Sequence, residues 1–308
     1  MATHAGLTRT SHLNVNCTDL ERSLHFYRDL LGLRPLVHTT TDPQPGRALG
    51  LDGDVQWDAW LLGDDRGFDG VAIDLLEWKT PLPGGRPAKH QNAPGFSRFA
   101  LLVSDLDRLH RTLTDAGVEC ASPPAESRFG KTASESSRIV LCKDPDGTTI
   151  ELVASGSDRV GHVHVNCRNL VRSRAFYEEV LGLTAVYHST PPPQPGAPFG
   201  LDGDILTEGW SFADPRGAGS FVIDLVEWKE PRTSGTAYPR ANHLGIYRLA
   251  FLVQDLDGFY ERLQTRGVRC ASAPQALRVG AELPVLQVLL CFDPDGAALE
   301  FIADPVPS

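Results

Sequence analysis

The stretch DPDGTTIEL at residues 144–152 decides the fold, because it returns near the C-terminus as DPDGAALEF at residues 293–301. Asp-Pro-Asp-Gly is typical of a tight turn, since proline fixes φ at the second position and glycine supplies backbone freedom at the fourth. The residues that follow alternate between apolar and polar, which indicates a strand with Glu151 or Glu300 on its polar face. Each copy therefore predicts one carboxylate at a fixed distance from a turn.

The rest of the chain repeats in the same way. HLNVNCTDLERSLHFYRDLLGL from residue 12 matches HVHVNCRNLVRSRAFYEEVLGL from residue 162, and PQPG, GLDGD and IDL-x-EWK recur at the same offset of 150 residues. The offset falls by one before the second DPDG turn, which marks a single-residue deletion. The sequence is a tandem duplication, and it predicts two domains at residues 1–155 and 156–308.

Length and composition indicate a globular protein. The 308 residues suffice for two domains, and a hydrophobic content of 41% with 22% charged residues is typical of folded chains. A net charge of -10 argues against nucleic acid or an anionic membrane surface as a partner. There is no apolar run of membrane-spanning length, no apolar signal core and no CxxC pair. We therefore expect a cytoplasmic monomer or homodimer with free thiols.

Each repeat divides again into two similar modules. In the first, a strand at residues 12–17 precedes a helix that Asp19 or Thr18 caps, and three further strands follow at about 35–40, 55–62 and 71–78. The pattern then restarts with a strand at 98–103, a helix at 106–116 and strands near residues 139 and 150. One strand, one helix and about three strands, repeated four times, predict an α+β fold with mixed or antiparallel sheets.

The module order, the pattern HxxxNxxDLxxSxxFYxxxLGL and the DPDGxxxEL stretch resemble the vicinal oxygen chelate superfamily. This superfamily includes glyoxalase I, bleomycin and fosfomycin resistance proteins, and extradiol dioxygenases. The resemblance implies paired βαβββ modules that form cupped sheets, with a small-molecule site on the concave face and helices over the convex face. Both pairings of modules, within each repeat and across the repeats, occur in the superfamily, and the sequence leaves them open.

Alternation along the strands assigns side chains to the two faces of each sheet. The apolar set, which we expect under the helices, is Leu13, Val15, Phe99, Leu101, Val103, Ile150 and Leu152. The opposite face carries one histidine, one aspartate, one arginine and one glutamate per repeat: His12, Asp74, Arg98 and Glu151, then His162, Asp224, Arg248 and Glu300. Asn14 and His164 project from the same face as the two histidines. We expect these polar side chains to gather in cavities.

Metal-binding members of the superfamily place ligands at three of these positions, namely histidine at His12 and His162, histidine or glutamine at Arg98 and Arg248, and glutamate at Glu151 and Glu300. Arginine has five donors and no lone pair, so it cannot replace a ligand. A divalent ion about 5 Å from it would be repelled by roughly 7 kcal/mol at an effective dielectric constant near 20. One prediction is therefore a metal-free site in which Arg98 lies between Asp74 and Glu151 as a bidentate partner.

The other prediction is a retained divalent metal, Fe, Mn, Ni or Zn. His162 and His164 with Glu300 would form a set of two histidines and one carboxylate. The first repeat offers only His12 and Glu151, because Asn14 replaces the second histidine. The alternative for His164 is a hydrogen-bonded cavity histidine without a metal.

Two functions follow from these alternatives. The first is an enzyme that acts on a small oxygenated organic molecule by dioxygenation, isomerisation or lyase chemistry, with Glu300 or Asp224 for proton transfer. The second is a metal-free binding or resistance protein in which Arg98 and Arg248 hold an anionic or aromatic ligand. Its further ligand contacts would come from Asp74, Asn14, Trp60 and Trp210, although core packing is the alternative role of the two tryptophans. A third possibility is that only one half binds.

Overall fold

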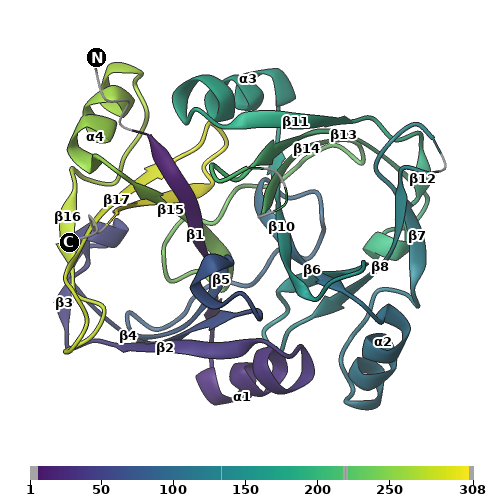
Figure 1. Ribbon diagram of the computed structural model, residues 1–308, viewed down its shortest axis with the longest axis horizontal. Coiled ribbons are helices and arrows are strands. Elements are labelled where there is room, and N and C mark those ends of the chain that lie inside the picture. Colours follow the sequence, from purple (N-terminus) through teal and green to yellow (C-terminus); the bar gives the residue numbers. More distant parts are fainter. Residues whose placement is uncertain (1–5, 133, 218, 220, 305–308) are drawn as a thin grey trace.

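The computed structural model describes residues 6–304 apart from residues 133, 218 and 220, and it contains four successive βαβββ modules (Figure 1). The first module comprises β1 (Leu7–Cys17), α1 (Leu20–Leu24), β2 (Arg34–Thr40), β4 (Asp54–Gly63) and β5 (Ala72–Thr80), with a short β3 (Gln44–Pro45). The second comprises β6 (Gly95–Val103), α2 (Leu106–Asp115), β7 (Ala125–Arg128), β8 (Ser136–Lys143) and β9 (Thr149–Ala154).

The second repeat has the same order of elements. Its first module comprises β10 (Arg159–Cys167), α3 (Leu170–Ala175), β11 (Thr184–Ser189), β13 (Asp204–Ala213) and β14 (Val222–Glu230), with a short β12 (Gln194–Pro195). Its second comprises β15 (Gly245–Val253), α4 (Leu256–Thr265), β16 (Gln275–Leu277), β17 (Leu286–Phe292) and β18 (Ala298–Ala303). One π-helical turn extends α1 to Leu30 and another extends α3 to Val180. No helix in the described ranges is long and apolar enough to cross a membrane.

The modules pair across the repeats. One sheet has the order β16-β17-β18-β15-β1-β5-β4-β2 and joins the first module to the fourth through antiparallel β1 and β15. The other has the order β11-β13-β14-β10-β6-β9-β8-β7 and joins the second module to the third through β10 and β6. Within each module the first and last strands run parallel. We call the first sheet the terminal cup and the second the central cup. The division at residues 155 and 156 stays a prediction.

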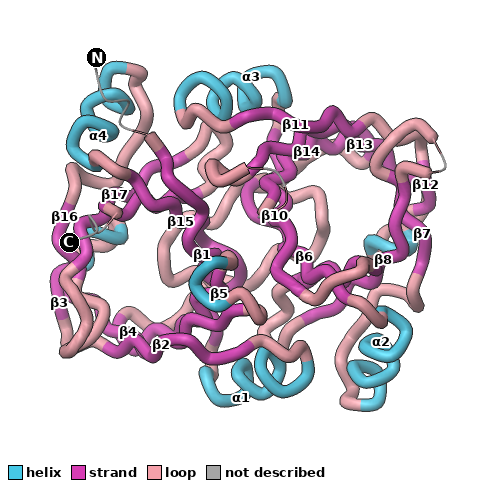
Figure 2. The backbone as a smooth tube through the Cα atoms, viewed as in Figure 1, coloured by secondary structure: helices cyan, strands magenta, loops and turns pink. Residues whose placement is uncertain are grey.

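Figures 1 and 2 show the two curled sheets side by side with the helices on their outer sides. The seven apolar side chains expected under the helices all belong to one buried core shared by both sheets. Smaller apolar clusters lie on the concave faces, around Trp57 and Trp78 in the terminal cup and around Phe199 and Trp228 in the central cup. The predicted α+β fold of cupped mixed sheets with helices on the convex face is confirmed.

The DPDG turn connects the two modules of a repeat on the convex side. Asp144 Oδ1 accepts the backbone N–H groups of Asp146 at 2.9 Å and Thr148 at 2.7 Å, and the hydroxyl of Tyr27 donates to Oδ2 at 2.9 Å. Burial raises the pKa of Asp144 to about 6. Asp19 caps α1 by accepting the N–H of Arg22, as predicted. Each repeat is thus held together by its turn, while its strands enter two different sheets.

Candidate functional site

Four adjacent strands supply the polar side chains at the floor of each cup. In the central cup, β14 carries Asp224, β10 carries His162 and His164, β6 carries Arg98 and β9 carries Glu151. In the terminal cup the equivalent side chains are Asp74 on β5, His12 and Asn14 on β1, Arg248 on β15 and Glu300 on β18. Because the strands pair across the repeats, each floor combines residues from both.

A guanidinium closes the floor of the terminal cup. Arg248 Nε lies 2.8 Å from Glu300 Oε2 and its Nη2 lies 2.8 Å from Asp74 Oδ2. His12 Nε2 is 3.3 Å from the same Glu300 oxygen, and Asn14 donates to Asp74 Oδ2 at 3.1 Å. Burial favours a neutral Glu300, but the charge of Arg248 outweighs it and lowers the pKa of Glu300 to about 2. Glu300 is therefore ionised, and both carboxylates pair with one arginine.

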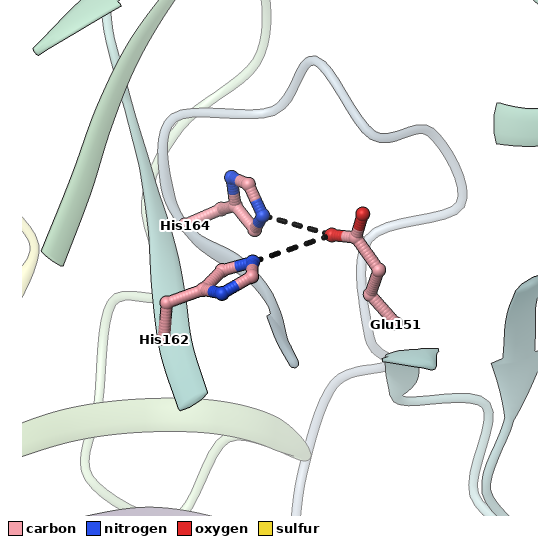
Figure 3. Close-up of side chains that lie close together, drawn as sticks. All are labelled: Glu151, His162 and His164. Carbon is pink, nitrogen blue, oxygen red and sulfur yellow. Dashed lines mark ion pairs between the residues drawn. The ribbon is translucent and has the colours of Figure 1, made fainter. Parts of the chain in front are cut away.

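The floor of the central cup is arranged differently. Arg98 Nε donates to Glu151 Oε2 at 2.6 Å, and Arg98 makes no ion pair with Asp224. His164 Nε2 and His162 Nε2 lie 2.8 and 3.9 Å from that Glu151 oxygen (Figure 3). The His164 ring is not aligned for this bond, and neither of its nitrogens has a hydrogen-bond partner in the described part of the chain. Burial and the charge of Arg98 lower the pKa of His164 to about 4, so its imidazole is neutral.

A serine explains why Asp224 does not bind the arginine. Ser211 Oγ donates to Asp224 Oδ1 at 2.5 Å, and its equivalent in the terminal cup is Leu61, which has no hydroxyl. Without that donor, Asp74 pairs with Arg248 instead. The other oxygen of Asp224 lies 3.9 Å from His162 Nε2, so it stays near the cavity.

The central cup contains a cavity of about 450 Å³ above this floor. Three substitutions between the repeats account for the space. Thr207, Ser127 and Ser137 line the cavity, whereas the equivalent residues of the terminal cup, Trp57, Leu277 and Leu286, belong to or pack against its apolar cluster. The equivalence follows from strand pairing, because Thr207 pairs with Trp228 as Trp57 pairs with Trp78, and Ser127 pairs with Ser137 as Leu277 pairs with Leu286. Large side chains thus fill the terminal cup where small ones leave the central cup hollow.

Comparison with known proteins identifies the family. The profile of the Glyoxalase/Bleomycin resistance protein/Dioxygenase superfamily matches residues 9–152 and again residues 159–301. The chain belongs to this superfamily. Lactoylglutathione lyase of Haemophilus influenzae is 25% identical over 151 residues, which cover 49% of this chain and 95% of that protein. A probable lactoylglutathione lyase of Synechocystis is 26% identical over 149 residues, 48% of this chain and 96% of that protein.

Solved structures of chains of similar length show the same fold. Glyoxalase I from Zea mays superposes with a TM-score of 0.67 at 20% identity, covering 96% of this chain and 92% of that one. A putative dioxygenase from Bacillus subtilis gives a TM-score of 0.58 at 14% identity, covering 97% and 86% of the two chains. At these sequence identities, the similarity shows a shared fold and nothing further.

The two floors differ in whether they fit the divalent metal that the superfamily suggests. In the terminal cup Arg248 lies between the two carboxylates, so a second cation does not fit there. In the central cup the ligand atoms of Glu151, His162 and His164 all lie within 4.8 Å of one another. In the described part of the chain the buried ring nitrogens of His164 have no hydrogen-bond partner, and the imidazole is neutral, so a lone pair is available. This donor set fits a divalent metal.

Three predicted groupings were wrong because the modules pair across the repeats. Arg98 does not lie between Asp74 and Glu151, since Asp74 belongs to the terminal cup and pairs with Arg248. Glu300 does not join His162 and His164 either, because it lies in the terminal cup against Arg248 and His12. The carboxylate near the two histidines is Glu151. Likewise, His12 and Glu151 are in different cups.

The two tryptophans proposed as ligand contacts already have stacking partners. Trp60 stacks on His38 with ring centroids 4.7 Å apart, and Trp210 stacks on His188 at 4.3 Å. The guanidinium of Arg174 lies 3.7 Å from the Trp210 ring centroid. Both tryptophans pack against the convex core, although Trp210 also reaches the cavity wall. Packing is therefore their main structural role.

Sequence reasoning missed the glutamine of each PQPG stretch. Gln194 Nε2 donates to the carbonyl of Arg128 at 2.9 Å, and its Oε1 accepts the Arg128 N–H at 2.8 Å. Gln44 makes the same pair with Arg278 at 2.7 and 3.1 Å. These bonds close each rim by joining β12 to β7 and β3 to the residue that follows β16. The recurrence of PQPG was the available signal, but only the cross-repeat pairing reveals the partner.

Proposed function

We propose that the chain binds and acts on a small oxygenated organic molecule in the central cup. The observation that carries this proposal is the cavity of about 450 Å³ above Arg98, Glu151, His162, His164 and Asp224. Its remaining walls are largely apolar and include Leu102, Ile139, Phe199 and Trp228. An apolar cavity with a few convergent polar groups at one end is the usual form of a small-molecule site.

Each floor residue has a role in this proposal. Asp224 accepts or returns a proton, since Ser211 orients one of its oxygens and leaves the other near the cavity. Glu151, His162 and His164 would hold a divalent metal, which when bound supplies Lewis-acid polarisation of substrate oxygens. The apolar walls exclude water and hold the body of the substrate. The terminal cup, with its paired charges and filled interior, is structural in this account.

A metal-free binding protein is the second candidate, and one contact favours it. Arg98 Nε occupies the same Glu151 oxygen that a metal would need, at 2.6 Å. At about 5 Å the repulsion between guanidinium and a divalent ion is roughly 7 kcal/mol at an effective dielectric constant of 20. Metal analysis after purification in metal-supplemented, anaerobic buffer separates the two candidates. About one equivalent of metal per chain, lost in His164→Ala and kept in Asn14→Ala, would support the metal site. The absence of stoichiometric metal would support the metal-free binding protein.

The ligand site itself is tested with the neutral fluorescent probe N-phenyl-1-naphthylamine. The wild type is expected to bind the probe, and Thr207→Trp, which introduces the side chain that fills the terminal cup, is expected to weaken binding by about tenfold or more. Thr265→Trp adds the same side chain to the exposed face of α4 and serves as the control. Absence of probe binding to the wild type, or equal binding to Thr207→Trp, would contradict the proposal.

A further inference from the structure

The two equivalent arginines differ in how much of the guanidinium is used. Arg248 binds two carboxylates, one through Nε and one through Nη2. Arg98 binds only Glu151, through Nε, and its terminal nitrogens have no protein acceptor in the described residues. Both side chains are buried, with exposed fractions of 6% for Arg248 and 7% for Arg98. Arg98 therefore has two donor groups left, and it lines the cavity.

The free donors of Arg98 are fixed in place. Glu151 holds Nε at 2.6 Å, and the guanidinium carbon lies 5.5 Å from the ring centroid of Phe199. Asp224 Oδ1 accepts the hydroxyl of Ser211 instead, so this carboxylate does not take the free donors. These donors open onto the cavity, where a ligand oxygen can accept from them in charge-assisted hydrogen bonds.

The charged side chains that line the cavity have no net negative charge that would repel a ligand carboxylate. Two arginines, Arg98 on the floor and Arg128 at the rim, formally cancel Glu151 and Asp224. A carboxylate matches the terminal fork of a guanidinium in geometry, because its two oxygens accept two parallel N–H bonds. Beyond this polar end, the apolar walls around Phe199 and Trp228 can contact only an apolar body.

We propose that the ligand of the central cup is a carboxylate on an apolar, aromatic-sized body, and that Arg98 binds the carboxylate through its two terminal nitrogens. This inference rests on the proposed function, since it names the ligand class of that same site. It concerns the state in which Arg98 Nε holds Glu151 Oε2, as in this structure.

The test is displacement of N-phenyl-1-naphthylamine by two ligands of equal shape, 2-naphthoate and 2-naphthamide. The wild type is expected to prefer 2-naphthoate by about tenfold, the worth of one strong charge-assisted bond. Arg98→Gln is expected to lose this preference, and Arg98→Lys to keep a part of it, because an ammonium supplies charge without the fork. Arg128→Gln removes the same charge at the rim and is expected to reduce the preference by less than about threefold. Uptake of the neutral probe reports that each variant keeps the folded cavity.

Each outcome separates the two proposals. Equal displacement by both ligands in the wild type, or a preference that survives Arg98→Gln, overturns the role of Arg98 while the cavity site stands. Equal losses in Arg98→Gln and Arg128→Gln also overturn it, because the preference would then reflect net charge. Probe binding that Thr207→Trp leaves unchanged removes the proposed function and this inference together.

Discussion

Trp57 and Thr207 occupy equivalent positions of the duplicated chain, and they separate a filled cup from a hollow one. Trp57 is 4% exposed and packs edge to face on Trp78, with ring centroids 6.1 Å apart. Thr207 lines the cavity beside the equivalent Trp228. One exchange of a large side chain for a small one therefore accounts for much of the difference in packing between two similar sheets.

The first prediction concerns these two positions. Trp57→Thr should lower the free energy of unfolding by about 3 to 5 kcal/mol, because it removes a buried indole and leaves a cavity. Thr207→Trp should change it far less, since its side chain enters space that already exists. Chemical denaturation of both variants measures the difference. Comparable losses in the two variants would show that the cups are packed alike.

The second prediction concerns acid stability through Glu300. Its pKa is about 2 in the folded chain against 4.5 in the reference state, so its ionised form stabilises the fold at neutral pH. This contribution, about 3 kcal/mol, is present above pH 4.5 and is lost as the pH falls towards 2. Urea denaturation between pH 6 and about 3 should show a shallower loss in Glu300→Gln than in the wild type.

The exposed Glu126 provides the control for that measurement. Its side chain is 59% exposed and faces Arg128 at 3.9 Å. Glu126→Gln should keep the wild-type slope. If Glu300→Gln kept it as well, Arg248 would not be stabilising the ionised Glu300.

The third prediction concerns the rim of the central cup. Gln194→Ala removes both hydrogen bonds to the backbone of Arg128, which should speed release of N-phenyl-1-naphthylamine by about tenfold. Gln44→Ala removes the equivalent pair to Arg278 in the terminal cup. It should destabilise the fold to a similar degree without changing release. Stopped-flow fluorescence distinguishes the two, and equal release rates would exclude a role for the rim in ligand retention.

The fourth prediction concerns the metal. Arg98→His removes the cation beside Glu151 and adds an imidazole, so affinity for Ni²⁺ should rise by about tenfold or more. Arg248→His makes the same change in the terminal cup, where Asn14 stands in place of His164, and should gain less. Equilibrium dialysis with metal analysis measures both. A larger gain in Arg248→His would mean that the terminal cup is the better metal site, which would contradict the proposed site in the central cup.

The sequence was sufficient for the fold and for the residue types on the floors. The DPDG repeat, the alternation around Phe99 and Ile150 and the cap at Asp19 depend on local rules, and the structure confirms them. The partners of Asp74 and Glu300 were wrong because they depend on which modules share a sheet. That choice is made by the pairing of β1 with β15 and of β6 with β10, which alternation along single strands does not encode.

The asymmetry between the cups could have been read from the repeat alignment. Trp57 against Thr207 and Leu277 against Ser127 are visible in the sequence, but their meaning needs the faces of short edge strands. Only the sheet order shows that Thr207 and Ser127 lie in one cup and that Trp57 and Leu277 lie in the other. The hydrogen bonding of Arg98 was harder still to predict, because it depends on the hydroxyl of Ser211 on β13, three strands away from β6.

The most direct test of the central claim is a crystal structure of the chain soaked with N-phenyl-1-naphthylamine. We expect one probe per chain in the central cup, against Phe199 and Trp228 and above Arg98. Density for the probe in the terminal cup, with Trp57 displaced, or no probe in the central cup at saturating concentration, would contradict it.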